Sequence, residues 1–352
     1  MTEPELTLVA HELLADFCAA CFEKLGLSRP DAELTSRSLV WASLRGTDSH
    51  GVVLAKEYAE RIRLGSINPH SRYAVVSEGP ATALMDAAAG VGQVAGFRAM
   101  TLAVEKASHA GVGIVGVKNS SHFGAAAFYS MMAVEHDMIG FTTTNAPPTM
   151  APWGGKARRL GNNPLSVAVP AGKYPPLVLD MATGASAWGK IFIAQQQGRK
   201  IPLTWALDKN GQPTDDPNVA FDGGFIQPIG EYKGYGLSLM LDVLAGVLTG
   251  SGFSIHIPAW NDRDQAQQVG HLMAAVRISC FMPVETFRAR IDELIRLMKD
   301  CPIAPGSDRV LVPGEIEYET EQQRRARGIP IHSAVKQDLL KLGQELGVAP
   351  PF

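Results

Sequence analysis

The spacing of apolar residues predicts helices throughout the first 65 residues. Apolar side chains recur every third or fourth position from residue 7 to 26, where a glycine is a common helix terminator. A second helix is predicted to begin at Ser28, because Pro30 and Asp31 suit a first helical turn. The same spacing predicts a third helix over residues 52–64. The chain therefore begins with a helical region.

Short apolar runs alternate with helical patterns after residue 73. The runs predict strands, and the segments between them predict helices such as 94–109. Strands are predicted over residues 83–86, 113–118, 138–144, 165–169, 177–180 and 272–279. Later helices are predicted over 234–248, which is apolar enough to be buried, over 284–298, and from residue 315, with an arginine cluster at 324–327 on a solvated face. This alternation predicts a layered α/β fold.

Two long irregular segments interrupt this pattern. Residues 145–164 are rich in Pro, Gly and Asn, and residues 208–230 are similar. Connections of this length usually have a function of their own. We therefore expect the first segment to line a pocket.

The composition is that of a folded globular protein, with 46% hydrophobic and 19% charged residues. The formal net charge is -3, and neither sign forms long runs, so we expect no nucleic-acid partner. The most apolar long stretch, residues 236–248, contains Asp242 and is too short to cross a bilayer. The first eight residues lack the features of a secretory signal. We expect a cytoplasmic protein that does not insert into a membrane.

Cys18 and Cys21 form a CxxC pair, a spacing that occurs in redox and zinc sites. Both lie on the apolar stripe of the first predicted helix, and the other two cysteines, Cys280 and Cys301, supply no second close pair. We interpret Cys18 and Cys21 as core residues.

Two segments resemble the glycine-rich fingerprint of dinucleotide-binding folds. Residues 111–116 match GxGxxG, but a helix is predicted before them and a strand after them, the reverse of what the fingerprint requires. Residues 90–95 lie in the right order, yet no acidic residue ends the next strand to bind a ribose. We interpret the second segment as an ordinary turn. The sequence also contains no Walker loop, HExxH or GxSxG motif.

Two histidines stand in polar, glycine-flanked frames that are typical of site loops. His50 lies in DSHG and His122 in NSSHFG. The ordinary pKa of histidine, roughly 6.5, suits proton transfer near neutral pH, and a following glycine allows a sharp turn or a close approach. His50 also precedes a predicted helix, whose N-terminus favours an anionic ligand. A metal-dependent hydrolase or lyase that uses the two histidines is the alternative, although no further metal ligands occur at a typical spacing.

Several motifs in order along the chain resemble those of the type-2 malate/L-lactate dehydrogenases. This family includes ureidoglycolate dehydrogenase, diketogulonate reductase, sulfolactate dehydrogenase and piperideine-2-carboxylate reductase. The matching segments are RGTDSHG at 45–51, NSSHFG at 119–124, residues 145–155, GNNP at 161–164, LDMA at 179–182, YKGYG at 232–236 and LVPGE at 311–315. They span nearly the whole chain.

The resemblance implies an oxidoreductase that uses NAD or NADP, has a nicotinamide-binding fold of non-Rossmann type, and forms a homodimer with each active site near the subunit contact. It implies two domains. Residues 1–75 with 301–352 would form a helical domain that contributes to the dimer and the active site, and residues 76–300 would form the α/β cofactor-binding domain. It assigns cofactor contacts to His122, Asn145, Gly161, Asn162, Asp180, Met181, Ala182, Lys233, Pro313, Gly314 and Glu315.

The residue types suit the implied reaction on a small 2-hydroxy or 2-oxo acid or a related cyclic imine acid. Reduction of a 2-oxo acid needs an aligned proton donor and a group that binds the carboxylate. His50 and His122 are both candidates for the general acid/base, with Ser49 as an orienting hydrogen-bond donor. Lys233 suits a phosphate or ribose contact, and Asp180 ends a strand that we expect to be parallel, where ligand pockets tend to open.

One position departs from the family pattern. The family commonly has an arginine four residues after the first histidine, and this chain has Leu54 there. A leucine cannot bind a carboxylate, so Arg45, Lys56 or Arg61 takes over that role or the substrate presents another group. We expect Arg45 and Lys56 to contact the substrate. Leu54 therefore argues against malate and lactate as the natural substrates. The sequence does not distinguish between NAD and NADP as the cofactor.

Overall fold

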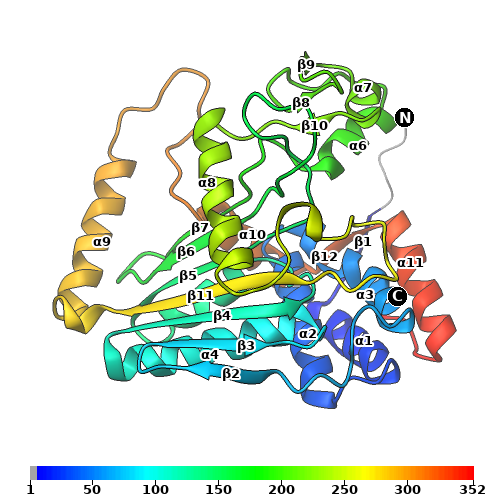
Figure 1. Ribbon diagram of the computed structural model, residues 1–352. Coiled ribbons are helices and arrows are strands. Elements are labelled where there is room, and N and C mark those ends of the chain that lie inside the picture. Colours follow the sequence, from blue (N-terminus) through cyan, green and yellow to red (C-terminus); the bar gives the residue numbers. More distant parts are fainter. Residues whose placement is uncertain (1–5) are drawn as a thin grey trace.

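A seven-stranded mixed sheet forms the centre of the protein in the computed structural model, which describes residues 6–352 (Figure 1). Across the sheet the strands are β2 (Ala74–Glu78), β3 (Thr82–Asp86), β4 (Val112–Ser120), β11 (Val269–Arg277), β5 (Met138–Thr144), β6 (Leu165–Val169) and β7 (Leu177–Met181). In this sheet β3 and β4 run parallel, and the other neighbours are antiparallel. The predicted mixed α/β fold is confirmed, and the order is not that of a doubly wound parallel sheet.

The expectation that Asp180 ends a parallel strand was wrong. β7 pairs with β6 in antiparallel register, with Asp180 opposite Ser166. Strand direction depends on how the chain returns to the sheet, and an apolar run of five residues has the same pattern in either direction. β2 was not predicted, because all five of its residues are exposed and give no core-facing signal.

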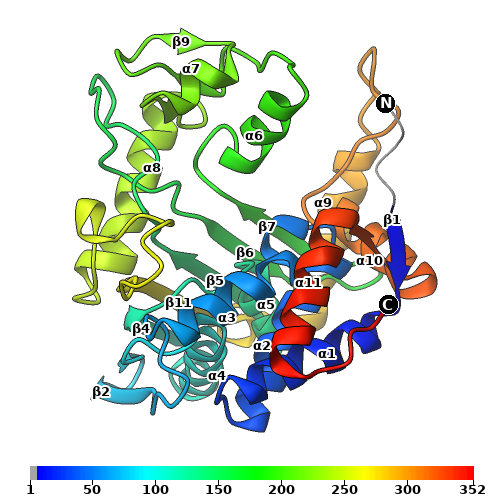
Figure 2. The same ribbon diagram turned by 90° about the vertical axis from the view of Figure 1, so that its right-hand side faces the viewer.

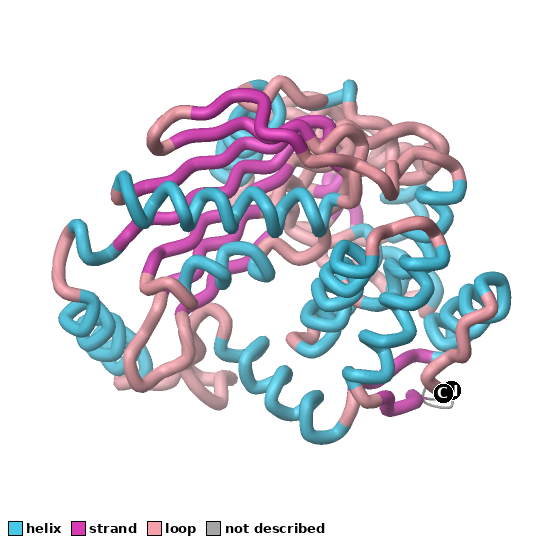
Figure 3. The backbone as a smooth tube through the Cα atoms, turned by 90° about the horizontal axis from the view of Figure 1, so that it is seen from below, coloured by secondary structure: helices cyan, strands magenta, loops and turns pink. Residues whose placement is uncertain are grey.

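Helices cover both faces of this sheet. α4 (Gly92–Ala110) and α5 (Ala127–Val134) pack across one face, as Figure 3 shows from below. The other face carries α8 (Tyr232–Asp242), which continues into a turn of π-helix at Val243–Val247 that packs on β11 and β4. Strand glycines allow the close packing of α4 and α5. A Cβ at Gly113 would lie 1.9 Å from the Ala103 carbonyl oxygen.

The GxGxxG match at residues 111–116 is structural, as the sequence indicated. Gly111 ends α4 in the left-handed conformation at φ +85°, and β4 begins at the next residue. Gly113 is required by the approach of α4. The pattern therefore arises from a helix end and a tightly packed strand.

The two ends of the described chain meet in a helical layer beside the sheet (Figure 2). This layer contains α1 (His11–Lys24), α2 (Arg29–Leu44), α3 (Ala55–Arg63), α10 (Glu315–Arg327) and α11 (Ser333–Leu346). β1 (Leu6–Val9) pairs antiparallel with β12 (Ile329–His332), so the first helix begins at His11 and not at residue 7. α2 begins close to the predicted start at Ser28, which is its N-cap, since the Ser28 Oγ accepts from the Asp31 N–H at 3.4 Å. The predicted boundaries of two domains stay a prediction.

Cys18 and Cys21 are core residues, as predicted. Both are unpaired and lie in the main apolar cluster with exposures of 0% and 1%. Burial raises the pKa of both thiols, and that of Cys21 reaches about 12. Buried thiols of this kind are poor nucleophiles.

A smaller lobe lies above the sheet in Figure 1. It contains α6 (Trp188–Gln196), β8 (Ala206–Leu207), β9 (Pro213–Thr214), α7 (Pro217–Phe221) and β10 (Phe225–Ile226), and α9 (Val284–Lys299) lies apart from it. Residues 208–230 are therefore not wholly irregular, because short paired strands and a helical turn occur within them. No helix within residues 6–352 is both long and apolar enough to cross a membrane.

Candidate active site

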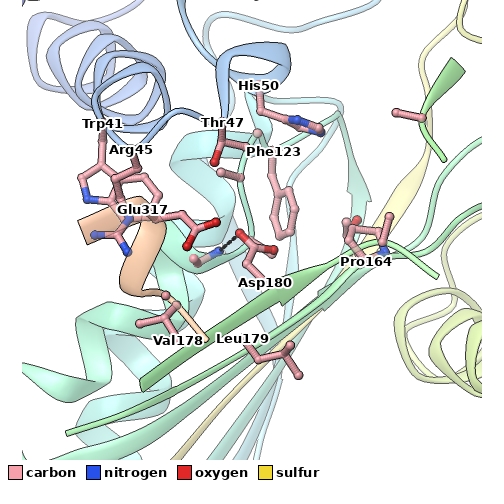
Figure 4. Close-up of a pocket in the computed structure, with 18 of the residues that line it drawn as sticks. Trp41, Arg45, Thr47, His50, Phe123, Pro164, Val178, Leu179, Asp180 and Glu317 are labelled. Carbon is pink, nitrogen blue, oxygen red and sulfur yellow. Dashed lines mark hydrogen bonds between the residues drawn. The ribbon is translucent and has the colours of Figure 1, made fainter. Parts of the chain in front are cut away.

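A cavity of about 490 Å³ opens between the helical layer and the sheet (Figure 4). Its size lies in the range of small-molecule sites. The predicted site residues on its lining are Arg45, His50, His122, Asn145, Asn162, Asp180, Ala182, Pro313 and Gly314. The irregular segment 145–164 also lines it, as predicted, through Asn145, Ala146, Asn162 and Pro164.

The two framed histidines lie together on this lining. Their rings stack with centroids 5.5 Å apart and planes at 29°. Ser49 Oγ lies 2.9 Å from Nδ1 of His50, so Ser49 contacts this ring from outside the cavity lining. Burial lowers the pKa of His50. The residues are 72 positions apart in the sequence, and only the fold brings the rings into contact.

His122 is held from several sides. Its Nδ1 lies 2.6 Å from the Tyr58 hydroxyl, and its backbone N–H donates to Gln267 Oε1 at 2.8 Å. The Trp260 ring meets it edge-on at 5.2 Å. Burial lowers the pKa of His122 well below its ordinary value, and the proximity of His50, His271 and Arg61 lowers it further. At neutral pH the ring is therefore uncharged and can accept a proton.

The glycines after the histidines serve different purposes. Gly124 has φ +80°, so it supplies the left-handed turn that the sequence indicated. Gly51 has φ -92° and makes no such turn. Its role is close approach, because a Cβ there would lie 2.1 Å from Ser43 Oγ and 3.1 Å from the Ser43 backbone nitrogen.

Arg324 ties the His50 loop to α10. Its guanidinium donates to both carboxylate oxygens of Asp48 and to the Ser43 carbonyl. The side chain is 17% exposed, so the interpretation of this arginine as part of a solvated face was wrong. Contacts 276 residues apart leave no periodic signal in a sequence.

Asp180 gives the cavity a carboxylate. Its Oδ2 accepts from the Ala127 N–H at the start of α5, at 2.9 Å (Figure 4). Burial raises its pKa to about 6, the Ala127 N–H opposes that shift, and the nearby Glu317 carboxylate adds to it. Glu317 points into the same part of the cavity and was not predicted.

The other predicted site residues lie off the lining or make protein contacts. Asn145 lines the cavity, but its side chain donates to Asp242 and Gly252 and accepts from the Gly270 N–H. Lys56 Nζ pairs with Asp338 at 2.6 Å. The Gly161 carbonyl accepts a hydrogen bond from Ser238, and Glu315 pairs with Lys299. Met181 lies on β7, and Lys233 is exposed at the start of α8.

Arg45 is the one lysine or arginine on this lining within the described residues. It donates to Glu321 at 2.9 Å and stacks on Trp41. Arg61 is wholly buried, bonds Glu57 at 2.9 Å and lies over the Trp260 ring. Leu54 packs against the apolar core and offers no anion-binding group.

A third histidine under the site was missed. His271 is fully buried, with its ring nitrogens 2.7 Å from Thr144 Oγ1 and from Ser120 Oγ, and it stacks on Phe123 at 4.6 Å. Burial lowers its pKa to about 3, so it stays neutral. Its position in an apolar run gave no signal of a site. Within residues 6–352 no three His, Cys, Asp or Glu side chains are grouped to hold a metal ion.

The lining fits a nicotinamide nucleotide in its chemistry. The small residues Gly124 to Ala127 contribute to the lining, and the Asp180 carboxylate can accept from a ribose hydroxyl. Gly314, at φ +87°, brings its backbone against Val178, where a Cβ would lie 2.9 Å away.

Comparison with known proteins gives a consistent picture. A family model described as malate/L-lactate dehydrogenase matches residues 9–340. The malate dehydrogenase of Pyrococcus abyssi is 40% identical over 347 residues, which is 97% of this chain and 95% of that protein. The solved sulfolactate dehydrogenase of Methanocaldococcus jannaschii superposes with a TM-score of 0.92 at 38% identity, over 97% of this chain and 98% of that one.

Related enzymes differ in the cofactor that they are named for. A ureidoglycolate dehydrogenase (NAD(+)) of Escherichia coli is 34% identical over 94% of this chain and 93% of its own length. A (2R)-3-sulfolactate dehydrogenase (NADP(+)) of Chromohalobacter salexigens is 32% identical over 87% of this chain and 89% of its own length.

Proposed function

This chain belongs to the malate/L-lactate dehydrogenase family, and we propose that it transfers a hydride between a nicotinamide cofactor and a small 2-hydroxy or 2-oxo acid, or a related cyclic imine acid. The observation that carries the proposal is the stacked pair His50 and His122, which lines the same cavity as the Asp180 carboxylate. When bound, the cofactor supplies the hydride acceptor or donor. The protein supplies the proton exchange and the orientation.

In this mechanism His122 is the general acid/base. In the oxidation direction its uncharged ring takes the proton of the substrate hydroxyl at Nε2, the nitrogen that Tyr58 does not contact. In the reduction direction the imidazolium returns that proton to the carbonyl oxygen. His50, held by Ser49, stacks beside it and limits the positions that the ring can take.

The substrate carries one carboxylate in this proposal. Arg45 is the one lysine or arginine on the lining among the described residues. Leu54 occupies the position where the family commonly has an arginine that can bind a carboxylate. A second carboxylate on the substrate would meet no further cation there. We therefore place hydroxy acids with an apolar or uncharged substituent, and cyclic imine acids, ahead of malate.

We expect NADH to be preferred over NADPH by at least about tenfold in kcat/KM. Asp180 and Glu317 both face the cavity, and a 2′-phosphate would add a third negatively charged group beside them. Thermal unfolding in the presence of NADH or NADPH measures binding. The rate at which each of them is oxidised with a panel of 2-oxo acids and cyclic imines measures activity. A ligand at 100 times its dissociation constant stabilises a protein by about 2.7 kcal/mol.

No thermal shift with either cofactor would contradict the oxidoreductase proposal, and a preference for NADPH would contradict the cofactor assignment. Asp180→Asn, which keeps the side-chain volume and removes the charge, should reduce the difference in kcat/KM between NADH and NADPH. Loss of activity on chelation would favour the metal-dependent alternative.

We further propose a homodimer in which a second copy covers α8. Residues 234–248 were predicted to form a buried helix, yet Met240 on α8 and Val247 in the π-helical turn that continues it are 53% and 52% exposed. An exposed apolar surface of this kind marks an interaction site. Light scattering should give twice the 37.7 kDa mass of the chain.

Met240→Lys should convert the dimer to a monomer. Leu297→Lys on α9 is the matched control, because Leu297 is similarly exposed, at 51%, on an amphipathic helix elsewhere on the surface. A monomeric wild-type protein at assay concentration would refute the dimer. Dissociation by Leu297→Lys alone would place the interface on α9.

A further inference from the structure

Residues 257–268 form a loop that leads into β11 and packs on His122, and we call them the Trp260 loop. The loop contacts His122 twice. The Trp260 ring meets the His122 ring edge-on, with centroids 5.2 Å apart, and Gln267 Oε1 accepts from the His122 backbone N–H at 2.8 Å. Neither Trp260 nor Gln267 is among the described residues that line the cavity, so the loop packs on His122 from outside it.

Arg61 on α3 binds Trp260 through both its ring and its backbone. The guanidinium carbon lies 4.9 Å from the centroid of the Trp260 ring, and Nη2 donates to the Trp260 carbonyl oxygen. Arg61 is wholly buried, and its Nε donates to Glu57 Oε1 at 2.9 Å. A guanidinium bonded on two sides has a fixed plane, and the Trp260 ring packs against it.

Arg263 ties the same loop to α3. Its Nη2 lies 2.9 Å from Glu57 Oε2, and its Nη1 lies 2.8 Å from Glu60 Oε2. The Ser66 hydroxyl donates to the Arg263 carbonyl oxygen. The Glu57 carboxylate is therefore shared by Arg61 of the helix and Arg263 of the loop. These contacts hold the Trp260 loop on α3.

The packing of this loop bears on the charge of the His122 ring. Loss of water disfavours an imidazolium, and burial is the largest cause of the lowered pKa of His122. The charged and titratable groups that face the ring are Arg61, Tyr58, His50 and His271. Trp260 carries no charge and can act only by excluding water. Arg61 carries a positive charge that also opposes protonation of the ring.

We propose that Trp260 shields the His122 ring from solvent and that Arg61 is the positioning residue that holds Trp260 against it. The shielded ring stays uncharged and ready to accept the proton of the substrate hydroxyl. This inference rests on the proposed role of His122 as the general acid/base. It also gives Arg61, one of the cations considered for the substrate carboxylate, a different role.

The direct test is a titration of His122 by nitrogen NMR of histidine-labelled protein without cofactor, with the signal assigned by its loss in His122→Gln. In the wild type we expect a midpoint well below pH 6.5. Trp260→Ala should move the midpoint toward that value by about one pH unit or more, because water then reaches the ring. Trp260→Phe, which keeps an aromatic ring, should move it less. An unchanged midpoint in Trp260→Ala overturns the proposal.

Two substitutions of Arg61 separate its position from its charge. Arg61→Met removes both the charge and the plane on which Trp260 packs, so the midpoint should move as in Trp260→Ala. Arg61→Lys keeps a positive charge and lacks the planar guanidinium, so it should also raise the midpoint. A wild-type midpoint in Arg61→Lys would mean that Arg61 acts through its charge alone, and would overturn its positioning role.

Arg263→Gln keeps the proposal testable if the variants of the buried Arg61 fail to fold. Arg263 is 46% exposed, and its substitution loosens the loop while Trp260 and Arg61 remain. We expect a smaller shift of the midpoint in the same direction. Arg63→Gln is the matched control, because Arg63 is 36% exposed on the same helix and pairs with Glu345 on α11 at 2.6 Å. Equal shifts in Arg263→Gln and Arg63→Gln would overturn the assignment to the Trp260 loop.

Kinetics provide the second measurement. The acid limb of kcat/KM for oxidation reports the ring of the free enzyme. In Trp260→Ala this limb should move to higher pH by the same amount as the NMR midpoint, a change that a general loss of structure does not produce. An acid limb that stays in place would overturn the proposal.

Failure of this inference can be told apart from failure of the proposed function. If the shielding is absent, the wild type is active and its NMR midpoint is the same as that of Trp260→Ala. If the proposed function is wrong, the wild-type protein oxidises no reduced nicotinamide with any 2-oxo acid or cyclic imine of the panel, whatever the midpoint.

Discussion

Replacing His122 by glutamine should lower kcat by roughly 10²- to 10⁴-fold, the usual contribution of a positioned general acid/base. Glutamine keeps polar atoms near Tyr58 and cannot exchange a proton. The KM for the cofactor and the cofactor-induced thermal shift should change little. Steady-state and single-turnover rates in both directions measure the effect.

His50→Gln is the matched comparison, because the two rings stack and line the same cavity. We expect a smaller loss, since His50 is bonded on one side by the exposed Ser49 and has no buried partner like Tyr58. A larger loss in His50→Gln than in His122→Gln would exchange their roles. Wild-type rates in both variants would remove histidine from the mechanism.

The pH dependence follows from the lowered pKa of His122. Burial and the nearby His50, His271 and Arg61 disfavour the imidazolium, so the free enzyme holds a neutral ring above a pKa that lies well below 6.5. The kcat/KM for oxidation should therefore fall only on the acid side of that pKa. The kcat/KM for reduction needs the protonated ring and should fall about tenfold per pH unit above it. An apparent pKa at or above 6.5 would contradict this reading of the site.

Gly92→Ala should strongly reduce both stability and activity. Gly92 begins α4, and a Cβ there would lie 2.2 Å from the Ser121 carbonyl oxygen and 2.5 Å from that of His122. These are backbone atoms, so the His122 loop must move away from α4. Such overpacking typically destabilises by about 1–3 kcal/mol. A displacement of roughly 1 Å at a catalytic group can lower the rate about 10²-fold.

Gly189→Ala is the control for this substitution. Gly189 lies in α6, and a Cβ there would have no neighbour within 4 Å. Thermal unfolding and kcat should both stay near the wild type. Gly92→Ala with unchanged unfolding and kcat would mean that the loop accommodates the methyl group and does not depend on this contact.

The turn at residues 90–95 does more than connect two elements. Residues 90–95 were interpreted as an ordinary turn, and they do connect β3 to α4. The turn supports the site as well, because the Gly92 N–H donates to Ser121 Oγ, which in turn donates to the Gly90 carbonyl. The glycines permit contact between two backbone segments, whereas in a dinucleotide fingerprint they permit contact with a phosphate.

The local features of this protein could be predicted from its sequence. The apolar runs at 138–144 and 165–169 coincide with β5 and β6, Ser28 caps α2, and both histidine frames lie on the cavity. The strands and the cap depend on neighbours within a few residues, through alternation along a strand or a polar side chain at a helix start, and each histidine frame is a short run that can be recognised without the fold. Ordered motifs across the chain also identified the family, as the match over residues 9–340 confirms.

Three features depend on long-range contacts that the sequence does not reveal. They are the direction of β7, the anchoring of Asp48 by Arg324, and the burial of His122 against Tyr58, Gln267 and Trp260. Tyr58 lies 64 positions from His122 and Gln267 lies 145 positions away. Periodicity reports which side of an element is apolar and carries no information about which distant element covers it. The electrostatics of the site depend on that covering, because burial and through-space neighbours shift the pKa values of His122 and Asp180.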